Sequence, residues 1–239
     1  MTTVLEVING SFKFLNKNVH RVLKSDSSRL HNKMMLSSKF IQDVRPKLYA
    51  IEASFERIEK SFGLPSFDPR EKGYLALKKT IVGQQLSIAS AAAIWNRFIS
   101  ADLKDEAILS HQADKELRDL GLSRQKISYL KSLANSKLDF ESLETMKNEE
   151  VIEKLTGIKG VGLWTAEIYC IFSLRRLDIF PAGDLALQEA AKHVLNLKSR
   201  PSEREIRKIA ESWMPYRSVC ALILWHFYRN FKSRESTLW

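Results

Sequence analysis

A glycine-rich stretch near residue 160 is the segment whose residue types most directly suggest chemistry. Three of the nine glycines in the chain, Gly157, Gly160 and Gly162, fall within residues 155–166. Helical spacing of apolar residues on both sides predicts two helices joined by a sharp turn through these glycines. The N–H groups that open the second helix can bind a phosphate oxygen, and Lys159 adds positive charge. The alternative is a plain glycine-rich connection between two core helices.

Asp184 is an acidic residue at the predicted start of a helix. It follows Gly183 and precedes apolar residues at helical spacing over 187–194. An aspartate in this place is typical of a helix N-cap, in which the carboxylate accepts hydrogen bonds from the first N–H groups of the helix. An N-cap carboxylate can also carry a catalytic role, because the two uses are compatible.

The histidines and cysteines predict no metal centre. The five histidines, at positions 20, 31, 111, 193 and 226, have no metal-ligand spacing, and Cys170 and Cys220 lie far apart in apolar segments. We expect the two cysteines to be buried free thiols of a protein from a reducing compartment. They are too few for an iron–sulfur cluster, which needs four.

Several segments together resemble the helix-hairpin-helix DNA glycosylases, most closely the alkylbase (3-methyladenine type II) branch. The similar segments follow one another in the family's order and cover roughly residues 43–234: they are 81–87, 117–133, 155–166 and 179–185. A set of linked motifs is far more specific than one glycine pattern. The resemblance implies an enzyme that flips a damaged base out of duplex DNA and cuts it from its sugar.

The resemblance also implies roles for individual residues. Asp184 would be the catalytic carboxylate, stabilising the positive charge that builds on the sugar as the base departs. Trp164 and Trp225 match family positions in the base pocket, although core packing is the alternative for both. In relatives that also cleave the DNA backbone, a lysine stands at the position of Trp164, so we expect base removal without lyase chemistry.

Two further sites follow from the same resemblance. The intercalating loop, which fills the gap left by the flipped base, would be Gln84, Gln85 and Leu86; Gln85 at the wedge position is polar, and an ordinary helix start is the alternative. A monovalent cation would bind the backbone carbonyls of Thr156, Ile158 and Val161 in the hairpin. No other cofactor is expected.

The elements that must position these residues are nearly all helical. We expect a two-lobed helical bundle with the active site between the lobes, and the helix-hairpin-helix at about 155–166. Apolar spacing predicts one helix over 48–62 ended by Gly63, another over 88–98, and a last one over 217–231. Residues 1–42 form an unassigned N-terminal arm, and 43–239 the glycosylase unit. The predicted N-caps are Ser87, Ser123, Asn148 and Ser202.

The charge of the chain favours a polyanionic partner. Lys and Arg number 38 against 28 Asp and Glu, a net charge of +10, so double-stranded DNA with a damaged base is the expected partner. The sequence lacks a signal-peptide core and a membrane span, which predicts a protein of the bacterial cytoplasm or the eukaryotic nucleus. We expect a monomer, because one hairpin fold already supplies a complete site. Two other functions stay open: a glycosylase of this fold for another lesion, and a non-catalytic DNA-binding protein that senses damage.

Overall fold

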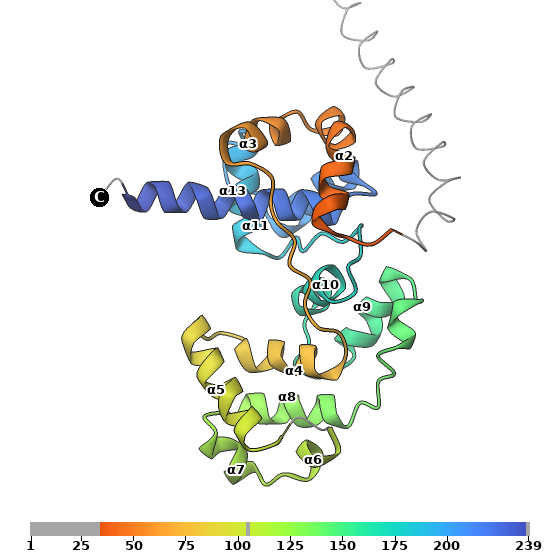
Figure 1. The fold of residues 1–239 in the computed structure, drawn as a ribbon, viewed down its shortest axis with the longest axis vertical. Coiled ribbons are helices and arrows are strands. Elements are labelled where there is room, and N and C mark those ends of the chain that lie inside the picture. The colour runs from red at the N-terminus through yellow and green to blue at the C-terminus, as the bar shows by residue number, and fades with distance from the viewer. Residues whose placement is uncertain (1–33, 104–105, 238–239) are drawn as a thin grey trace, which may run out of the picture. The chain divides into compact units, whose positions relative to one another are not determined.

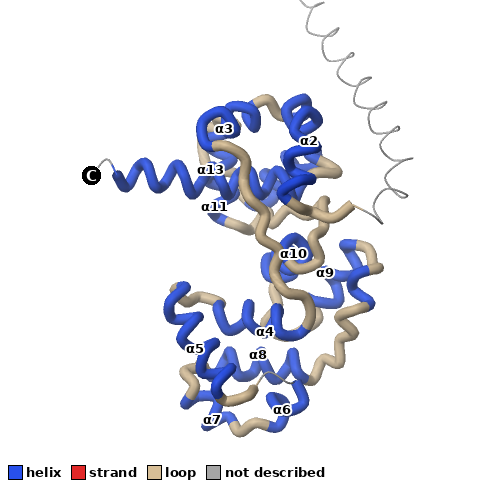
Figure 2. Tube along the Cα trace, in the orientation of Figure 1, coloured by secondary structure: helices blue, strands red, loops and turns tan. Residues whose placement is uncertain are grey.

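The computed structural model describes residues 34–103 and 106–237 of the chain. Residues Leu36–Trp239 form one compact unit. Its described segments are helices joined by turns and loops, with no strand among them (Figure 2). This confirms the all-α fold that the spacing of apolar residues predicts. In the same described segments, no helix is both long enough and apolar enough to cross a bilayer.

Four of the helices have a serine as their N-cap. In each case the hydroxyl of the preceding residue accepts a hydrogen bond from a backbone N–H of the first turn, which otherwise has no helical partner. Three of these caps confirm the sequence prediction. The four are Ser37 before α2 (Ser38–Ile51), Ser87 before α5 (Ile88–Ser100), Ser123 before α8 (Arg124–Ala134) and Ser202 before α12 (Glu203–Ala210).

The prediction of one helix over 48–62 is wrong. The segment contains the end of α2, which closes at Ile51, and a second helix, α3 (Ser54–Phe62). The carboxylate of Glu52 accepts a hydrogen bond from the N–H of Ser54 (3.0 Å), which favours a new helix start at this point. Leu48 and Phe55 are both buried in the core, and the apolar spacing therefore continues across the break.

Asn148 is not an N-cap. It is the first residue of α9 (Asn148–Thr156), and the cap position belongs to Lys147, whose N–H donates to the carboxylate of Glu150 (2.9 Å). The Asn148 side chain instead donates to the carbonyl of Asp178 (3.3 Å). The amide thus bridges two segments that are distant in sequence.

The helices gather into two groups with a helical hairpin between them (Figure 1). In one group, α4 (Tyr74–Gly83) contacts α5 and α8, and α8 contacts α6 (Glu106–His111) and α7 (Asp114–Asp119). In the other, α13 (Arg217–Thr237) contacts α3 and α11 (Leu185–Val194), and α11 contacts α12. The hairpin consists of α9 and α10 (Leu163–Phe172), and α10 also contacts α4.

Trp213 anchors the second group beneath the loop that leads to α11. It lies in the short helix η2 (Glu211–Trp213) and is fully buried. Its ring packs edge-on against Phe55 (5.6 Å between centroids) and Phe180 (5.3 Å). Such aromatic contacts contribute about 0.5–1.5 kcal/mol each beyond area burial. Phe180 is therefore fixed in the core four positions before Asp184.

The helical core begins before residue 43. Leu36, Phe40 and Ile41 are buried, and α2 starts at Ser38. Residues 36–42 thus pack with the unit that was expected to begin at Asp43. Residues 1–33, most of the predicted arm, lie outside the described residues, and the division of the chain into arm and glycosylase unit stays a prediction.

Candidate active site

The helical hairpin has the predicted geometry. Helix α9 ends at Thr156 and α10 restarts at Leu163. In the turn between them, the N–H of Val161 donates to the carbonyl of Ile158 (3.0 Å). Gly160 has a φ of +92°, a conformation that disfavours any residue with a side chain. A Cβ atom at this position would stand 2.6 Å from Cβ of Tyr129 on α8, so the turn and α8 approach each other closely.

The outer side of the turn is open. Gly162 is the N-cap of α10 with an extended backbone (φ −80°, ψ 170°), and a Cβ atom built on it meets nothing within 4 Å. The N–H groups of the first turn of α10 begin beside this open position, where an anion is favoured by the helix terminus. Lys159 is exposed, and its N–H donates to the Ser132 hydroxyl (3.2 Å). The hairpin therefore presents accessible backbone N–H groups and the exposed ammonium group of Lys159.

The predicted intercalating loop lies against the hairpin. The Gln84 side chain donates to the carbonyl of Gly160 (3.0 Å), which ties it to the protein. Gln85 has a φ of +56° and is exposed, and Leu86 is 37% exposed. Of the three residues, Leu86 thus supplies exposed apolar surface, whereas Gln84 joins the loop to the hairpin.

A cleft of about 420 Å³ lies where this loop, the start of α8 and the hairpin meet. Its lining includes the ammonium-bearing side chains of Lys126 and Lys159 together with Gly160 and Gly162. The Lys126 Nζ atom donates to the carbonyl of Val82 at the end of α4 (2.7 Å), and partial burial lowers the pKa of Lys126. The cleft is polar and positive, which suits the backbone of a nucleic acid.

The hairpin carbonyls are compatible with a cation. Thr156, Ile158 and Val161 all line the same cleft. Thr156 ends α9, where carbonyl groups lose their helical partners. The Ile158 carbonyl already accepts from Val161, but each carbonyl oxygen has two lone pairs. Elsewhere in the described ranges, no cluster of three or more His, Cys, Asp or Glu side chains could hold a metal ion.

Asp184 caps α11 as predicted. Its Oδ1 atom accepts from the N–H groups of Ala186 (2.9 Å) and Leu187 (3.1 Å). Its Oδ2 atom accepts from the indole Nε1–H of Trp164 (2.9 Å). A carboxylate offers about four lone-pair sites, so these three bonds fix its orientation and leave accepting capacity for a ligand. The carboxylate is held by the protein before any substrate arrives.

Exposed apolar side chains neighbour Asp184 and its hydrogen-bond partner Trp164. Trp164 is 42% exposed, its neighbour Leu163 is 41% exposed, and Leu185, directly after Asp184, is 63% exposed. Exposed apolar side chains that form a contiguous patch often mark a binding site. The arrangement places an aromatic face and a fixed carboxylate side by side.

Trp225 lies in a different aromatic cluster. It is half-buried on α13, and its ring contacts Phe172 (5.8 Å between centroids) at the end of α10, whereas Trp164 stands near the start of that helix. Phe172 in turn stacks on Phe67 (5.9 Å) and lies under the Arg70 guanidinium (4.6 Å). The pocket role of Trp225 stays a prediction.

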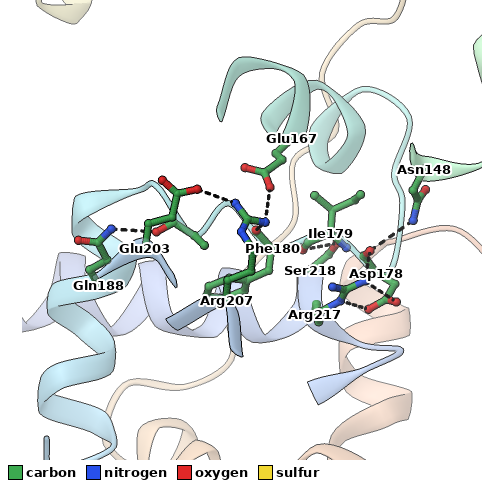
Figure 3. Close-up of polar contacts among 11 residues, drawn as sticks. Asn148, Glu167, Asp178, Ile179, Phe180, Gln188, Glu203, Arg207, Arg217 and Ser218 are labelled. Carbon is green, nitrogen blue, oxygen red and sulfur yellow. Dashed lines mark hydrogen bonds and ion pairs between the residues drawn. The ribbon is translucent and has the colours of Figure 1, made fainter. Parts of the chain in front are cut away.

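Side chains of α11 and α13 support the loop that ends at Asp184 (Figure 3). Arg217 forms an ion pair with Asp178 (2.6 Å between Nε and Oδ1), and the Ser218 hydroxyl accepts from the N–H of Ile179 and donates to its carbonyl. Gln188 donates to the carbonyl of Ala182 (2.8 Å). Sequence reasoning missed these residues. The available signal was polar side chains, such as Gln188 and Ser218, beside apolar residues of their helices.

The two cysteines are structural. Both are buried free thiols, as predicted. Burial raises the pKa of Cys170 to about 12 and raises that of Cys220 well above its ordinary value. A thiol in this state is a poor nucleophile and a poor metal ligand.

Comparison with known proteins places this site in a family. The family described as HhH-GPD superfamily base excision DNA repair protein matches residues 79–216. The matched range contains the loop at Gln84, the hairpin and Asp184. DNA-3-methyladenine glycosylase 1 of Schizosaccharomyces pombe is 32% identical over 196 residues, which cover 74% of this chain and 83% of that protein.

Two solved structures are similar to this one in both fold and sequence. The DNA-3-methyladenine glycosidase of Bacillus halodurans gives a TM-score of 0.70 at 32% identity, covering 78% of this chain and 89% of the other. The S. pombe 3-methyladenine DNA glycosylase in complex with abasic DNA gives 0.65 at 32% identity, covering 74% and 92%. This chain belongs to the HhH-GPD superfamily of base excision DNA repair proteins.

Proposed function

We propose that this protein is a monofunctional DNA glycosylase that removes alkylated bases, 3-methyladenine and 7-methylguanine among them, from duplex DNA. The observation that carries the proposal is the Asp184 carboxylate, fixed by three hydrogen bonds beside the half-exposed indole of Trp164. The similar proteins named as 3-methyladenine glycosylases support this choice of substrate.

The carboxylate provides electrostatic stabilisation. Breaking the N-glycosidic bond builds positive charge on the sugar, and a preorganised carboxylate next to it lowers the barrier. The same group can orient or deprotonate the attacking water. An alkylated purine already carries positive charge and leaves readily, so it needs little protonation by the enzyme. A cationic base also stacks favourably on the Trp164 ring.

The hairpin and the loop at Gln84 bind the DNA from which the base is extruded. Phosphate oxygens bind at the open N–H groups beside Gly162 and at Lys159, which gives affinity without sequence preference. Extrusion costs a few kcal/mol, and an apolar side chain inserted in the gap offsets part of this cost. The exposed Leu86 serves this purpose better than the polar Gln85.

Two smaller proposals concern the absence of strand cleavage and the binding of a monovalent cation. Trp164 stands where a Schiff-base lysine would be needed, so strand cleavage is not part of the reaction. A monovalent cation binds the carbonyls of Thr156, Ile158 and Val161, where it would add positive charge at the hairpin. Replacing K⁺ by a large organic cation at constant ionic strength is then expected to weaken DNA binding.

The remaining proposals concern assembly and location. A single chain supplies Asp184, the hairpin and the loop at Gln84, so we propose that the protein acts as a monomer. We propose that it acts where the chromosome lies, in the bacterial cytoplasm or the eukaryotic nucleus. Size-exclusion chromatography with light scattering tests the first, and imaging of a tagged chain tests the second.

The test of the function is release of free base from methylated duplex DNA by the purified protein. Asp184→Asn is the matched variant, because asparagine is as good an N-cap as aspartate. We expect its rate to fall by about 10²–10⁴-fold while the fold and DNA affinity persist. A parallel assay without alkali is expected to show intact strands.

Each other outcome of this assay would reject part of the proposal. Undiminished release by Asp184→Asn would remove the carboxylate from the mechanism. No release by a folded wild-type protein that still binds DNA would reject alkylated bases as substrates. Release from DNA with oxidised or deaminated bases would then identify a glycosylase for another lesion, and no release from any of them a non-catalytic damage sensor.

A further inference from the structure

Arg207 connects three segments around the loop that ends at Asp184 (Figure 3). It extends from α12, and its guanidinium donates to the carboxylate of Glu167 on α10 (3.0 Å) and to that of Glu203 on its own helix (2.9 Å). It also donates to the carbonyl of Phe180 in the loop (3.5 Å). A planar guanidinium with five donors can make such a three-way connection, whereas an ammonium group makes a single point contact.

Burying the Glu167 carboxylate in the core costs free energy of desolvation. Its side chain is only 3% exposed, and Oε2 is buried without a hydrogen-bond partner among the described residues. Burial raises the pKa of Glu167 despite its ion pair with Arg207. Replacing a buried ion pair by apolar residues is often neutral or stabilising, so stability alone does not account for Glu167.

The pair is linked to the candidate active site in two ways, through α10 and through the loop that ends at Asp184. Glu167 lies three residues after Trp164 on α10, and positions three apart share a helix face. Trp164 donates to Asp184. On the other side, the Glu203 carboxylate lies 3.4 Å from the place where a Cβ atom at Gly183 would stand. Arg207 thus reaches Asp184 from both directions, through α10 and through the loop.

We propose that Arg207, oriented by Glu167 and Glu203, is a positioning residue that sets the distance between the Asp184 carboxylate and the Trp164 indole. The proposal rests on the proposed function, because the rate of base removal depends on that geometry. A misplacement of about 1 Å at a reacting centre can cost about 10²-fold in rate. Arg207 touches no reacting atom in this scheme and acts only through the loop and α10.

The kinetic test compares single-turnover base release by the wild type with that of two variants of the ion pair and one control variant. Arg207→Lys keeps the charge but loses the three-way connection, and we expect a rate about tenfold lower, roughly 1.4 kcal/mol in barrier. The double variant Glu167→Leu with Arg207→Met removes both charges, so the core holds no unpaired ion and the fold is retained. We expect its rate to fall about 10²-fold, with the half-saturating enzyme concentration changed by less than about twofold.

Arg45→Ala is the matched control. Arg45 forms an ion pair with Glu59 (2.9 Å) that is close in length to the Arg207–Glu167 pair (3.0 Å). It joins α2 to α3, far from Asp184 in sequence. We expect an unchanged rate. Lowered melting temperature with an unchanged rate in both Arg207 variants would show that the pair is merely structural and would overturn the proposal.

An NMR measurement reads the positioning without any activity. The chain has five tryptophans, and the Trp164 indole N–H signal is identified by its loss in Trp164→Phe. We expect this signal to shift in Asp184→Asn and, in the same direction, in Arg207→Lys, but not in Arg45→Ala. A signal unmoved in Arg207→Lys overturns the proposal even if base release slows. Absence of base release by the wild type counts against the proposed function alone, and the indole signal still decides the positioning role.

Discussion

Gly160→Ala and Gly162→Ala should separate the folding of the hairpin from its binding of DNA. At Gly160 the added methyl meets two obstacles. The φ of +92° costs a residue with a side chain about 1–2 kcal/mol. The methyl would also stand 2.6 Å from Cβ of Tyr129, and relief of such overpacking costs about 1–3 kcal/mol. The expected loss is roughly 3 kcal/mol, which lowers the melting temperature by roughly 6–12 °C for a chain of this size.

Gly162→Ala is the matched variant two positions away. Its backbone is extended and its Cβ position meets nothing within 4 Å, so we expect a change in stability within about 0.5 kcal/mol. The new methyl, however, stands where a phosphate must approach the first N–H groups of α10. We expect affinity for a duplex to fall about tenfold, or roughly 1.4 kcal/mol.

The assay is urea unfolding followed by circular dichroism, with DNA binding measured by fluorescence anisotropy at fixed salt. Tyr129→Ala combined with Gly160→Ala removes the ring atoms that the new methyl would meet but keeps Cβ of residue 129 and the strained φ, so the double variant should recover only part of the lost stability. A Gly160→Ala protein as stable as wild type would refute the reasoning from backbone and overlap. Full DNA affinity in Gly162→Ala would refute the assignment of this turn to phosphate.

Three further predictions follow from charge and burial. Lys159→Ala should lower the slope of log affinity against log salt by about 0.9, measured by anisotropy titrations; an unchanged slope would remove Lys159 from the interface. Because burial raises the pKa of Glu167 above its ordinary 4.5, the folded state keeps this proton where the unfolded chain has lost it, and its contribution to stability falls as pH rises through that window. Melting temperatures should therefore shift in favour of Glu167→Gln as pH rises from 4.5, and parallel curves would contradict this. Both buried cysteines should resist a thiol reagent at about pH 8 until the chain unfolds, and rapid labelling of the native protein would show that the helices open.

Local features of the chain were predictable because they depend on neighbours in sequence. The caps at Ser87, Ser123 and Ser202 each join a hydroxyl to an N–H three residues later. The turn of the hairpin and the N-cap at Asp184 follow from glycines and a carboxylate at the ends of apolar periods. Catalytic and pocket roles came from resemblance to a family and stay proposals.

The break between α2 and α3 shows where local pattern fails. Both helices bury their apolar side chains in one core, so the spacing from Leu48 to Phe62 gives no sign of the interruption at Glu52. Asn148 is a second example, since its side chain finds the Asp178 carbonyl thirty residues away instead of its own helix end. At Asn148 a contact between segments distant in sequence decides the local structure, whereas the break at Glu52 leaves the apolar spacing unchanged and so escapes a prediction based on that spacing.

By itself, the sequence determined the helical fold of the part that the structure describes, a hairpin with a glycine turn, and a carboxylate at the start of the helix that follows, because each depends on interactions within a few residues. Only the tertiary structure decided that Trp164 donates to Asp184, that Tyr129 requires glycine at position 160, and that Arg207 joins Glu167 to the loop that ends at Asp184. These contacts join residues 20 to 40 positions apart, and no periodicity records them because they arise when separately formed helices pack.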